Sequence, residues 1–127
     1  MSENFLGSFR NGEEVRLDAG QVLFKKGDVG QEIYVVLSGE LQILDGNRVF
    51  ETVGRGDIVG EMALVDGGPR SATVRAISAS EVSPLDERRF LFMVQQTPHF
   101  ALRVMRVMSA RLRAMNARAT ELDHPDA

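Results

Sequence analysis

One stretch of the sequence decides the fold, and it reads Val59-Gly60-Glu61-Met62-Ala63-Leu64-Val65-Asp66-Gly67-Gly68-Pro69-Arg70-Ser71-Ala72-Thr73. The stretch joins two segments whose composition is typical of β-strands, and it places a carboxylate, Glu61, nine positions before a guanidinium, Arg70. Glycines lie at both ends of the loop between these two side chains. Gly60 has no Cβ, so it can adopt a positive φ and let a ligand approach the main chain closely. The loop is therefore a candidate binding site.

The residue types in this loop are those that bind a phosphorylated sugar. Residues 61–64 are good helix formers, and the first amides of a helical turn point the same way without partners, which favours an anion. Arg70 adds a planar fork that matches two phosphate oxygens, and Ser71 adds a hydroxyl donor. Glu61 needs a different target, and a sugar hydroxyl is the obvious one, as in folds where an acid binds a ribose 2′-OH. These residues predict a ligand that carries a phosphate, a sugar and little charge.

The same residues also allow a structural interpretation. A glutamate and an arginine at the ends of a loop often form a solvated ion pair, and Gly-Gly-Pro is a common turn sequence. Chemistry alone leaves both interpretations open.

The loop resembles the phosphate-binding cassette of the cyclic nucleotide-binding domain family. The family pattern is Gly-Glu-x-Ala-Leu, a short loop, and then Pro-Arg-x-Ala, and every fixed position is filled here, by Gly60, Glu61, Ala63, Leu64, Pro69, Arg70 and Ala72. The resemblance implies that Arg70 binds the cyclic phosphate and that Glu61 binds the ribose 2′-hydroxyl. It assigns the other phosphate contacts to the hydroxyl of Ser71 and to the amides of Gly60, Met62 and Ala63, and it includes Ala72 in the binding loop.

Two further positions bear on the choice of nucleotide. Relatives selective for cGMP often have threonine where this chain has Ser71, whereas catabolite-activator-like relatives have serine and use cAMP, so the resemblance favours cAMP. Met115 and Asn116 align with the polar adenine contacts of those regulators. Asn116 can hydrogen-bond the base, while Met115 can only pack on it. Asn116 therefore joins the expected binding residues, with an uninvolved surface residue as the alternative.

Composition indicates one globular domain. With 127 residues, 43% of them hydrophobic and 26% charged, the chain can bury a core without disulfides or metal ions. It has no cysteine, which excludes a disulfide framework and thiol chemistry. The longest apolar runs, 33–37 and 90–94, are five residues long, so neither spans a membrane, and the N-terminus has no signal segment. We expect a cytoplasmic protein that does not contact a membrane.

The net charge of −3 hides an asymmetry along the chain. Residues 1–85 carry 8 basic and 13 acidic side chains, whereas residues 86–127 carry 7 and 5. An acidic body offers no footprint for nucleic acid, and it makes an anion site more dependent on Arg70. The basic tail is expected to be a solvated helix face, and direct DNA binding is not expected without an additional module.

Short apolar segments separated by glycine turns predict an antiparallel β jelly-roll barrel. The family that the cassette resembles has the same fold, with helices packed at the end of the barrel. We expect a single domain over residues 1–127, with an N-terminal segment at 1–12 that is a short helix or frayed, a barrel at 13–85 that includes the cassette at 59–73, and hinge and C-terminal helices at 86–122. From Glu13 the pattern has a period of two, with Val15 and Leu17 alternating with charged neighbours, and further strands are expected at 22–24, 32–37, 40–44, 48–53, 72–76 and 81–85.

Two helices are expected after the barrel. Asp86 is a candidate N-cap for a helix that ends near Gln96 and buries Phe90, Leu91, Met93 and Val94. Pro84, just before it, predicts an edge or a bulge in the last strand. The final helix, 98–122, carries apolar residues at heptad spacing, which predicts a homodimer seam or a face packed on the barrel. The seam residues are Met105, Met108, Leu112, Met115, Ala119 and Leu122.

The resemblance implies a sensor that binds a cyclic nucleotide, without enzymatic activity, and moves its C-terminal helices in response. Three alternatives are a metal-dependent enzyme of the cupin type, a degenerate barrel that only dimerises or docks a partner, and the sensor half of a DNA-binding regulator. Cupin chemistry needs clustered imidazoles, and the two histidines, His99 and His124, both lie in the helical tail. The intact Glu61 and Arg70 argue against a degenerate barrel.

Overall fold

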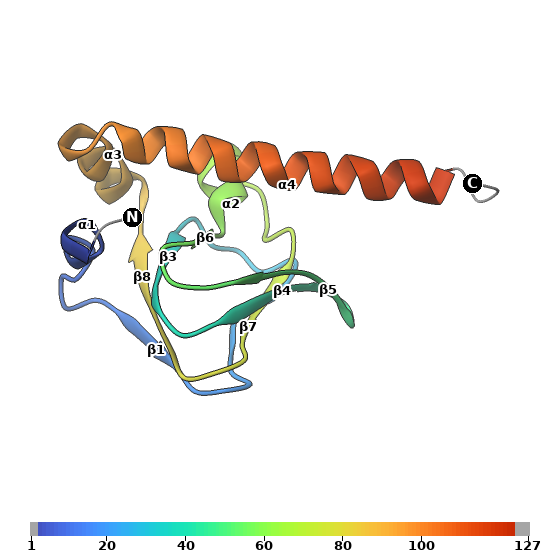
Figure 1. The fold of residues 1–127 in the computed structure, drawn as a ribbon, viewed down its shortest axis with the longest axis horizontal. Helices are drawn as coiled ribbons and strands as arrows, with labels where there is room; N and C mark the ends of the chain where they lie inside the picture. The colour runs from blue at the N-terminus through green and yellow to red at the C-terminus, as the bar shows by residue number, and fades with distance from the viewer. Residues whose placement is uncertain (1–2, 124–127) are drawn as a thin grey trace. The chain divides into compact units, whose positions relative to one another are not determined.

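The computed structural model describes residues 3–123, with side chains described for 5–64 and 66–117. The chain divides into two compact units, Met1–Leu91 and Phe92–Ala127. The first unit contains the strands β1 (Val15–Leu17), β2 (Val22–Phe24), β3 (Ile33–Ser38), β4 (Leu41–Asp45), β5 (Arg48–Val53), β6 (Ile58–Val59), β7 (Thr73–Ala76) and β8 (Ser80–Leu85) (Figure 1). Its helices are α1 (Glu3–Gly7), α2 (Glu61–Asp66) and the first half of α3 (Glu87–Gln96).

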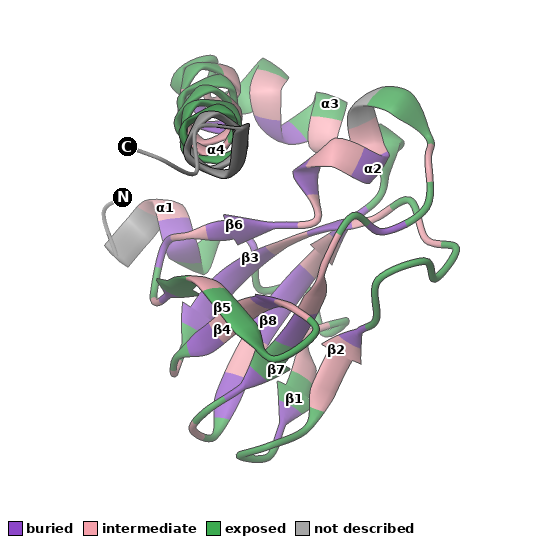
Figure 2. Ribbon diagram, turned by 90° about the vertical axis from the view of Figure 1, so that its right-hand side faces the viewer, coloured by how far each residue is buried: buried purple, intermediate pink, exposed green. Residues whose placement is uncertain are grey.

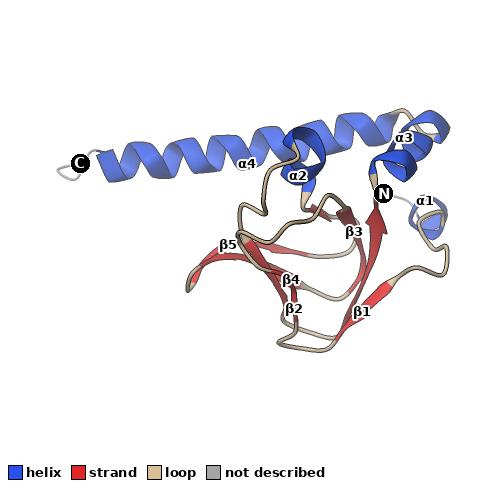
Figure 3. Ribbon diagram, turned by 180° about the vertical axis from the view of Figure 1, so that it is seen from behind, coloured by secondary structure: helices blue, strands red, loops and turns tan. Residues whose placement is uncertain are grey.

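The eight strands form two antiparallel four-stranded sheets, in the orders β1-β8-β3-β6 and β2-β7-β4-β5 (Figure 3). Of the described strands, only β4 and β5 are both consecutive in sequence and neighbours in a sheet. Every other connection between consecutive described strands crosses from one sheet to the other, which is the plan of a double-sheet jelly roll. The predicted β jelly roll is therefore confirmed. The strands predicted with explicit bounds match the observed ones to within a residue, but the two-residue strand β6 was not predicted.

The core of the barrel lies between the two sheets. Alternate residues of each strand face inward because successive side chains of a strand point to opposite faces. The buried residues that pack together come from both sheets and are Leu17, Phe24, Val36, Leu41, Val53, Val59, Val74, Ala76 and Val82. Figure 2 shows the contrast between β3, which is mostly buried, and the hairpin strand β5, which is mostly exposed.

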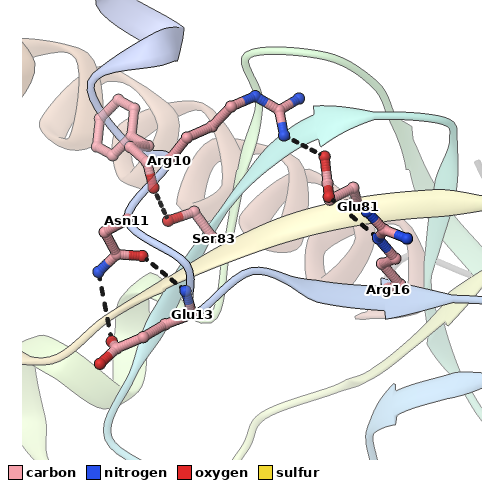
Figure 4. A network of polar contacts seen from close by, with 7 residues as sticks. Arg10, Asn11, Glu13, Arg16, Glu81 and Ser83 are labelled. Carbon is pink, nitrogen blue, oxygen red and sulfur yellow. Dashed lines mark hydrogen bonds and ion pairs between the residues drawn. The ribbon is translucent and has the colours of Figure 1, made fainter.

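The N-terminal segment is held to β8 by a hydrogen bond and an ion pair (Figure 4). It forms the short helix α1, one of the two outcomes expected from the sequence, and Phe9 beyond that helix is fully buried. The carbonyl of Phe9 accepts a hydrogen bond of 2.7 Å from the Ser83 hydroxyl. Glu81 forms ion pairs with Arg10 and Arg16, and the hydrogen bond from Arg10 is the main cause that lowers the pKa of Glu81.

One prediction about this region holds only locally, and another is wrong. Strand β8 as a whole is not an edge, because it pairs with β1 on one side and with β3 on the other, but at Pro84 it has a partner strand on one side only. The pairing with β1 ends at Val82, so Pro84 faces only Tyr34 of β3 and interrupts the ladder on one side at most. Leu91 is 58% exposed and not buried, whereas Met93 of the same helix is 3% exposed. The two residues are separated by about 200° around a helix, so they cannot both face the same core.

The second unit contains the end of α3 and the long helix α4 (His99–Asp123). Phe100 and Val104 are buried, while three seam residues, Met105, Leu112 and Met115, are about half exposed. Met108 is half-buried, and the side chains of Ala119 and Leu122 lie outside the described ones. Within residues 3–123, no helix combines the length and the apolar character needed to cross a membrane.

Gly39, between β3 and β4, provides a test of how tightly the barrel is packed. Its φ is +84°, and a Cβ there would lie 2.2 Å from the Ser80 hydroxyl and 2.5 Å from the Ala79 carbonyl oxygen. Gly46 in the β4–β5 turn also has a positive φ, but no atom lies within 4 Å of its would-be Cβ. We expect Gly46→Ala to cost about 1–2 kcal/mol of folding free energy and Gly39→Ala to cost at least about 3 kcal/mol, because the second adds a clash to the same backbone strain.

Urea denaturation of the two variants measures the difference. An equal loss in both would show that backbone conformation alone requires glycine at position 39.

Candidate functional site

The cassette is bounded by two glycines in the left-handed conformation. Strand β6 ends at Val59, and Gly60, with φ 81° and ψ 13°, turns the chain into α2. At the other end Gly67, with φ 67°, donates its N–H to the carbonyl of Ala63 and closes the helix. The predicted helical turn is therefore confirmed, and it continues to Asp66. Because α2 packs against β3, the cassette is held against one of the two sheets.

Glu61 and Arg70 are the only Asp, Glu, Lys or Arg side chains that are fully buried among those the structure describes. Each is 4% exposed, and the other buried polar residues are serines. Burying a charge costs free energy unless partners replace the water that it loses. Their burial in one cassette makes the two side chains candidates for a functional site.

The main chain of Arg70 is bound to the loop between β2 and β3. The N–H of Arg70 donates to the carbonyl of Asp28 at 2.9 Å, and the carbonyl of Arg70 accepts from the N–H of Gly27 at 2.8 Å. That loop is itself closed by a hydrogen bond from the Asp28 N–H to the Lys25 carbonyl. The start of the arginine side chain is therefore fixed before the guanidinium makes any contact.

The guanidinium lies between carbonyl oxygens and aromatic rings. Nη1 donates to the carbonyl of Glu32 at 2.8 Å and to that of Gly60 at 3.4 Å. Cζ lies 4.3 Å from the centroid of the Phe24 ring and 5.7 Å from that of Tyr34, both within the range of cation–π attraction. The Glu32 carboxylate lies 3.7 Å from Nη2. These groups replace the lost water and hold the fork in one orientation.

Two glycines make room for the guanidinium. A Cβ on Gly30 would lie 2.7 Å from Nη2 and 3.0 Å from Nε of Arg70, and a Cβ on Gly60 would lie 2.7 Å from Nη1. The sequence pattern predicts no role beside the arginine for Gly30, Glu32 or Phe24. They are 38 to 46 positions away from Arg70, so no local pattern connects them to it.

The pKa of Tyr34, the single tyrosine, depends on the burial and the charges of this site. Burial raises the pKa of Tyr34 above its usual value of 10.0 and the Glu32 carboxylate raises it further, whereas Arg70 lowers it. The phenol is therefore neutral at physiological pH, and its ring presents an uncharged face to the guanidinium.

The other residues expected to bind the ligand are placed as follows. In the cassette Ala63 is buried, Met62 and Ala72 are half-buried, and Ser71 is exposed. Asn116 lies on α4, in the second unit, and is exposed. The structure thus brings Gly60 and Arg70 into contact, with Glu61 directly after Gly60, while the ligand contacts themselves stay predictions.

Comparison with known proteins identifies the family. The family model described as "Cyclic nucleotide-binding domain" matches residues 14–97, which is well over half of the chain. The chain belongs to the cyclic nucleotide-binding domain family. The matched region begins just before β1 and ends at the close of α3, so it includes the barrel and the whole cassette.

Relatives of this cyclic nucleotide-binding domain occur in proteins of different activity. It is 31% identical to the Neurospora crassa protein "Lysophospholipase nte1", over 80% of this chain and 7% of that protein. It is 33% identical to the "Cyclic AMP receptor protein" of Thermus thermophilus, over 74% of this chain and 46% of that protein. The solved structure of the Thermus thermophilus catabolite activator protein superimposes with a TM-score of 0.78 at 25% identity, over 97% of this chain and 61% of that one. The chain therefore spans less than a tenth of the first relative and about half of the second.

The cupin alternative lacks a metal-binding cluster in the part of the chain that the structure describes. No group of three or more His, Cys, Asp or Glu side chains is close enough together there to hold a metal ion. The domain is assigned to the cyclic nucleotide-binding family by the family match and not by the lack of a metal-binding cluster among the described residues.

Gly30→Ala tests whether the guanidinium needs the space beside it. The new methyl group would force Arg70 out of its place, and we expect a loss of about 1–3 kcal/mol in folding free energy, as for other overpacked sites. Gly7→Ala in α1 is the matched control, because no atom lies within 4 Å of its would-be Cβ. Urea denaturation gives both values, and equal stabilities for the two variants would contradict the expected clash.

Proposed function

We propose that this chain is a cyclic nucleotide sensor that binds cAMP in preference to cGMP. The observation that carries the proposal is the burial of Glu61 and Arg70 at the two ends of one cassette in a cyclic nucleotide-binding domain. A buried guanidinium with fixed orientation suits a phosphodiester, and a buried carboxylate suits a sugar hydroxyl. The preference for cAMP is supported by Ser71 and by the likeness to the Thermus cyclic AMP receptor protein.

In this proposal each cassette residue has one role. Arg70 binds the cyclic phosphate, together with the amides of residues 60–63 and the hydroxyl of Ser71. Glu61 binds the ribose 2′-hydroxyl, and Ala72 keeps the loop close to the ligand. Asn116 hydrogen-bonds the base. The proposal assigns no catalytic residue.

We further propose that binding moves the C-terminal helices. Arg70 donates to the carbonyl of Glu32, which directly precedes β3, and β3 is paired with β8. Helix α3 begins immediately after β8, where the Asp86 carboxylate caps it by accepting the N–H of Arg89 at 2.8 Å. A shift of the guanidinium toward a phosphate therefore has a short covalent and hydrogen-bonded route to the start of α3. A ligand shifts such an equilibrium only if it binds the two states with different affinity.

Arg70→Ala tests the site. A charge-assisted hydrogen bond contributes about 1.5–3 kcal/mol, so we expect the variant to lose at least about tenfold in affinity for cAMP, and Glu61→Gln to lose somewhat less. Calorimetry with cAMP, cGMP and 5′-AMP measures the affinities of both variants and of the wild type.

Arg75→Ala is the control for this experiment. It removes the same charge from an exposed position on β7, where the guanidinium contacts Gln42, and it should leave cAMP affinity unchanged. Unchanged cAMP affinity in Arg70→Ala would place the binding site elsewhere. A wild-type chain that binds neither cyclic nucleotide would favour the degenerate barrel, whose function is docking.

We also propose that α4 forms a homodimer through its heptad seam. Met105, Leu112 and Met115 are about half exposed, which is unusual for three large apolar side chains at heptad spacing. The double variant Met108→Glu, Leu112→Glu places like charges in that seam and should be monomeric by light scattering where the wild type is dimeric. The matched control, Ala110→Glu with Ala114→Glu, adds the same charges at exposed positions away from the seam and should stay dimeric. A monomeric wild type would contradict the proposal that α4 forms a homodimer.

A further inference from the structure

Two nitrogens of Arg70 are left without hydrogen-bond acceptors. Nη1 is engaged by the carbonyls of Glu32 and Gly60, but neither Nε nor Nη2 donates a hydrogen bond to any residue that the structure describes. The edge formed by Nε and Nη2 lies against Gly30, where a Cβ would come within 2.7 Å of Nη2 and 3.0 Å of Nε. This edge is one of those on which a guanidinium binds two oxygens of an anion at once.

The Glu32 carboxylate lies beside that edge. Its Oε2 is 3.7 Å from Nη2, which is close enough for an ion pair but beyond hydrogen-bond distance. The Arg70 side chain is 3% exposed, whereas the Glu32 side chain is 47% exposed. The carboxylate is therefore in contact with solvent, while the guanidinium beside it is buried.

Glu32 acts on Arg70 in two separable ways. Its main-chain carbonyl accepts a hydrogen bond from Nη1 and so orients the fork. Its side chain balances the charge of the fork without hydrogen-bonding it. A change of side chain alone removes the second effect and leaves the first.

We propose that the Glu32 carboxylate is a resident counter-ion, which competes with the phosphate of the ligand for the Nε–Nη2 edge of Arg70 and thereby sets the affinity of the site. This inference rests on the proposed function, and it concerns the strength and selectivity of binding at the same site.

The competition weakens binding for an electrostatic reason. A bound phosphate either displaces the carboxylate into solvent or stays beside a like charge, and both cost free energy. The cost is larger for a dianion such as 5′-AMP than for a singly charged phosphodiester, so Glu32 also favours cyclic over linear nucleotides. Because the carboxylate is half exposed, salt screens this repulsion.

Glu32→Gln is the test, since the amide keeps the size of the side chain and the main-chain carbonyl while removing the charge. From the strength of charge pairs near a protein surface, we expect cAMP affinity to rise about three- to tenfold at low salt, and the gain to fall toward onefold at about 1 M salt. The gain for 5′-AMP should exceed that for cAMP wherever both are measurable. Glu13→Gln is the matched control, because it removes one exposed carboxylate from the segment before β1, where Glu13 contacts Asn11.

Tyr34 provides a readout that needs no nucleotide. It is the only tyrosine in a chain without tryptophan, so its ultraviolet titration reports this site alone. Glu32 is one of the two causes that raise the pKa of Tyr34, so Glu32→Gln should lower that pKa and Glu13→Gln should leave it unchanged. An unchanged Tyr34 pKa in Glu32→Gln would show that the carboxylate is not at the site in solution.

The calorimetric outcomes separate this inference from the proposed function. If the wild type binds cAMP and Glu32→Gln binds it equally or more weakly, the counter-ion inference is overturned, but the proposal that the chain is a cyclic nucleotide sensor is not. If no variant binds a cyclic nucleotide, the sensor proposal fails and the competition fails with it. A gain that persists unchanged at high salt would also overturn the inference, because its cause would not be charge.

Discussion

The buried guanidinium of Arg70 is the constraint on which the rest of the site depends. A charge removed from water must be compensated, and here two carbonyl oxygens, two aromatic rings and a neighbouring carboxylate provide the compensation. Each of them has to approach closely, which is why glycine occupies positions 30 and 60, where a Cβ would touch the nitrogens of the fork. The cassette, the loop before β3 and the end of β2 are thus positioned around one side chain.

The jelly roll makes this convergence possible. Its strands mostly pass from one sheet to the other, so segments distant in sequence meet at the same end of the barrel. Phe24 ends β2, Glu32 precedes β3, and Gly60 follows β6, yet all three contact Arg70. Binding residues on loops held by a rigid barrel can be retained or changed without changing the core.

Relatives of this domain form parts of longer proteins with different names. The chain matches 7% of a fungal lysophospholipase and 46% of a bacterial cyclic AMP receptor protein. What these proteins share with this chain is the domain, and the family model covers the barrel and cassette but not most of α4. The unit that these proteins share with this chain is therefore the barrel with its cassette. In our proposal the Glu32 carboxylate adjusts affinity without any change in that cassette.

The sequence by itself determined the cassette and every strand except the two-residue β6, because alternation, turn glycines, caps and a contiguous motif are local properties that a linear chain displays. Asp86 was recognised as an N-cap in this way, and α3 begins where it predicts. Only the tertiary structure decided that β8 is an interior strand, that Leu91 faces away from the core, and that Phe24, Gly30 and Glu32 surround Arg70. The physical reason is that pairing partners, burial and the environment of a charge depend on contacts between segments up to 67 residues apart, which no local pattern records.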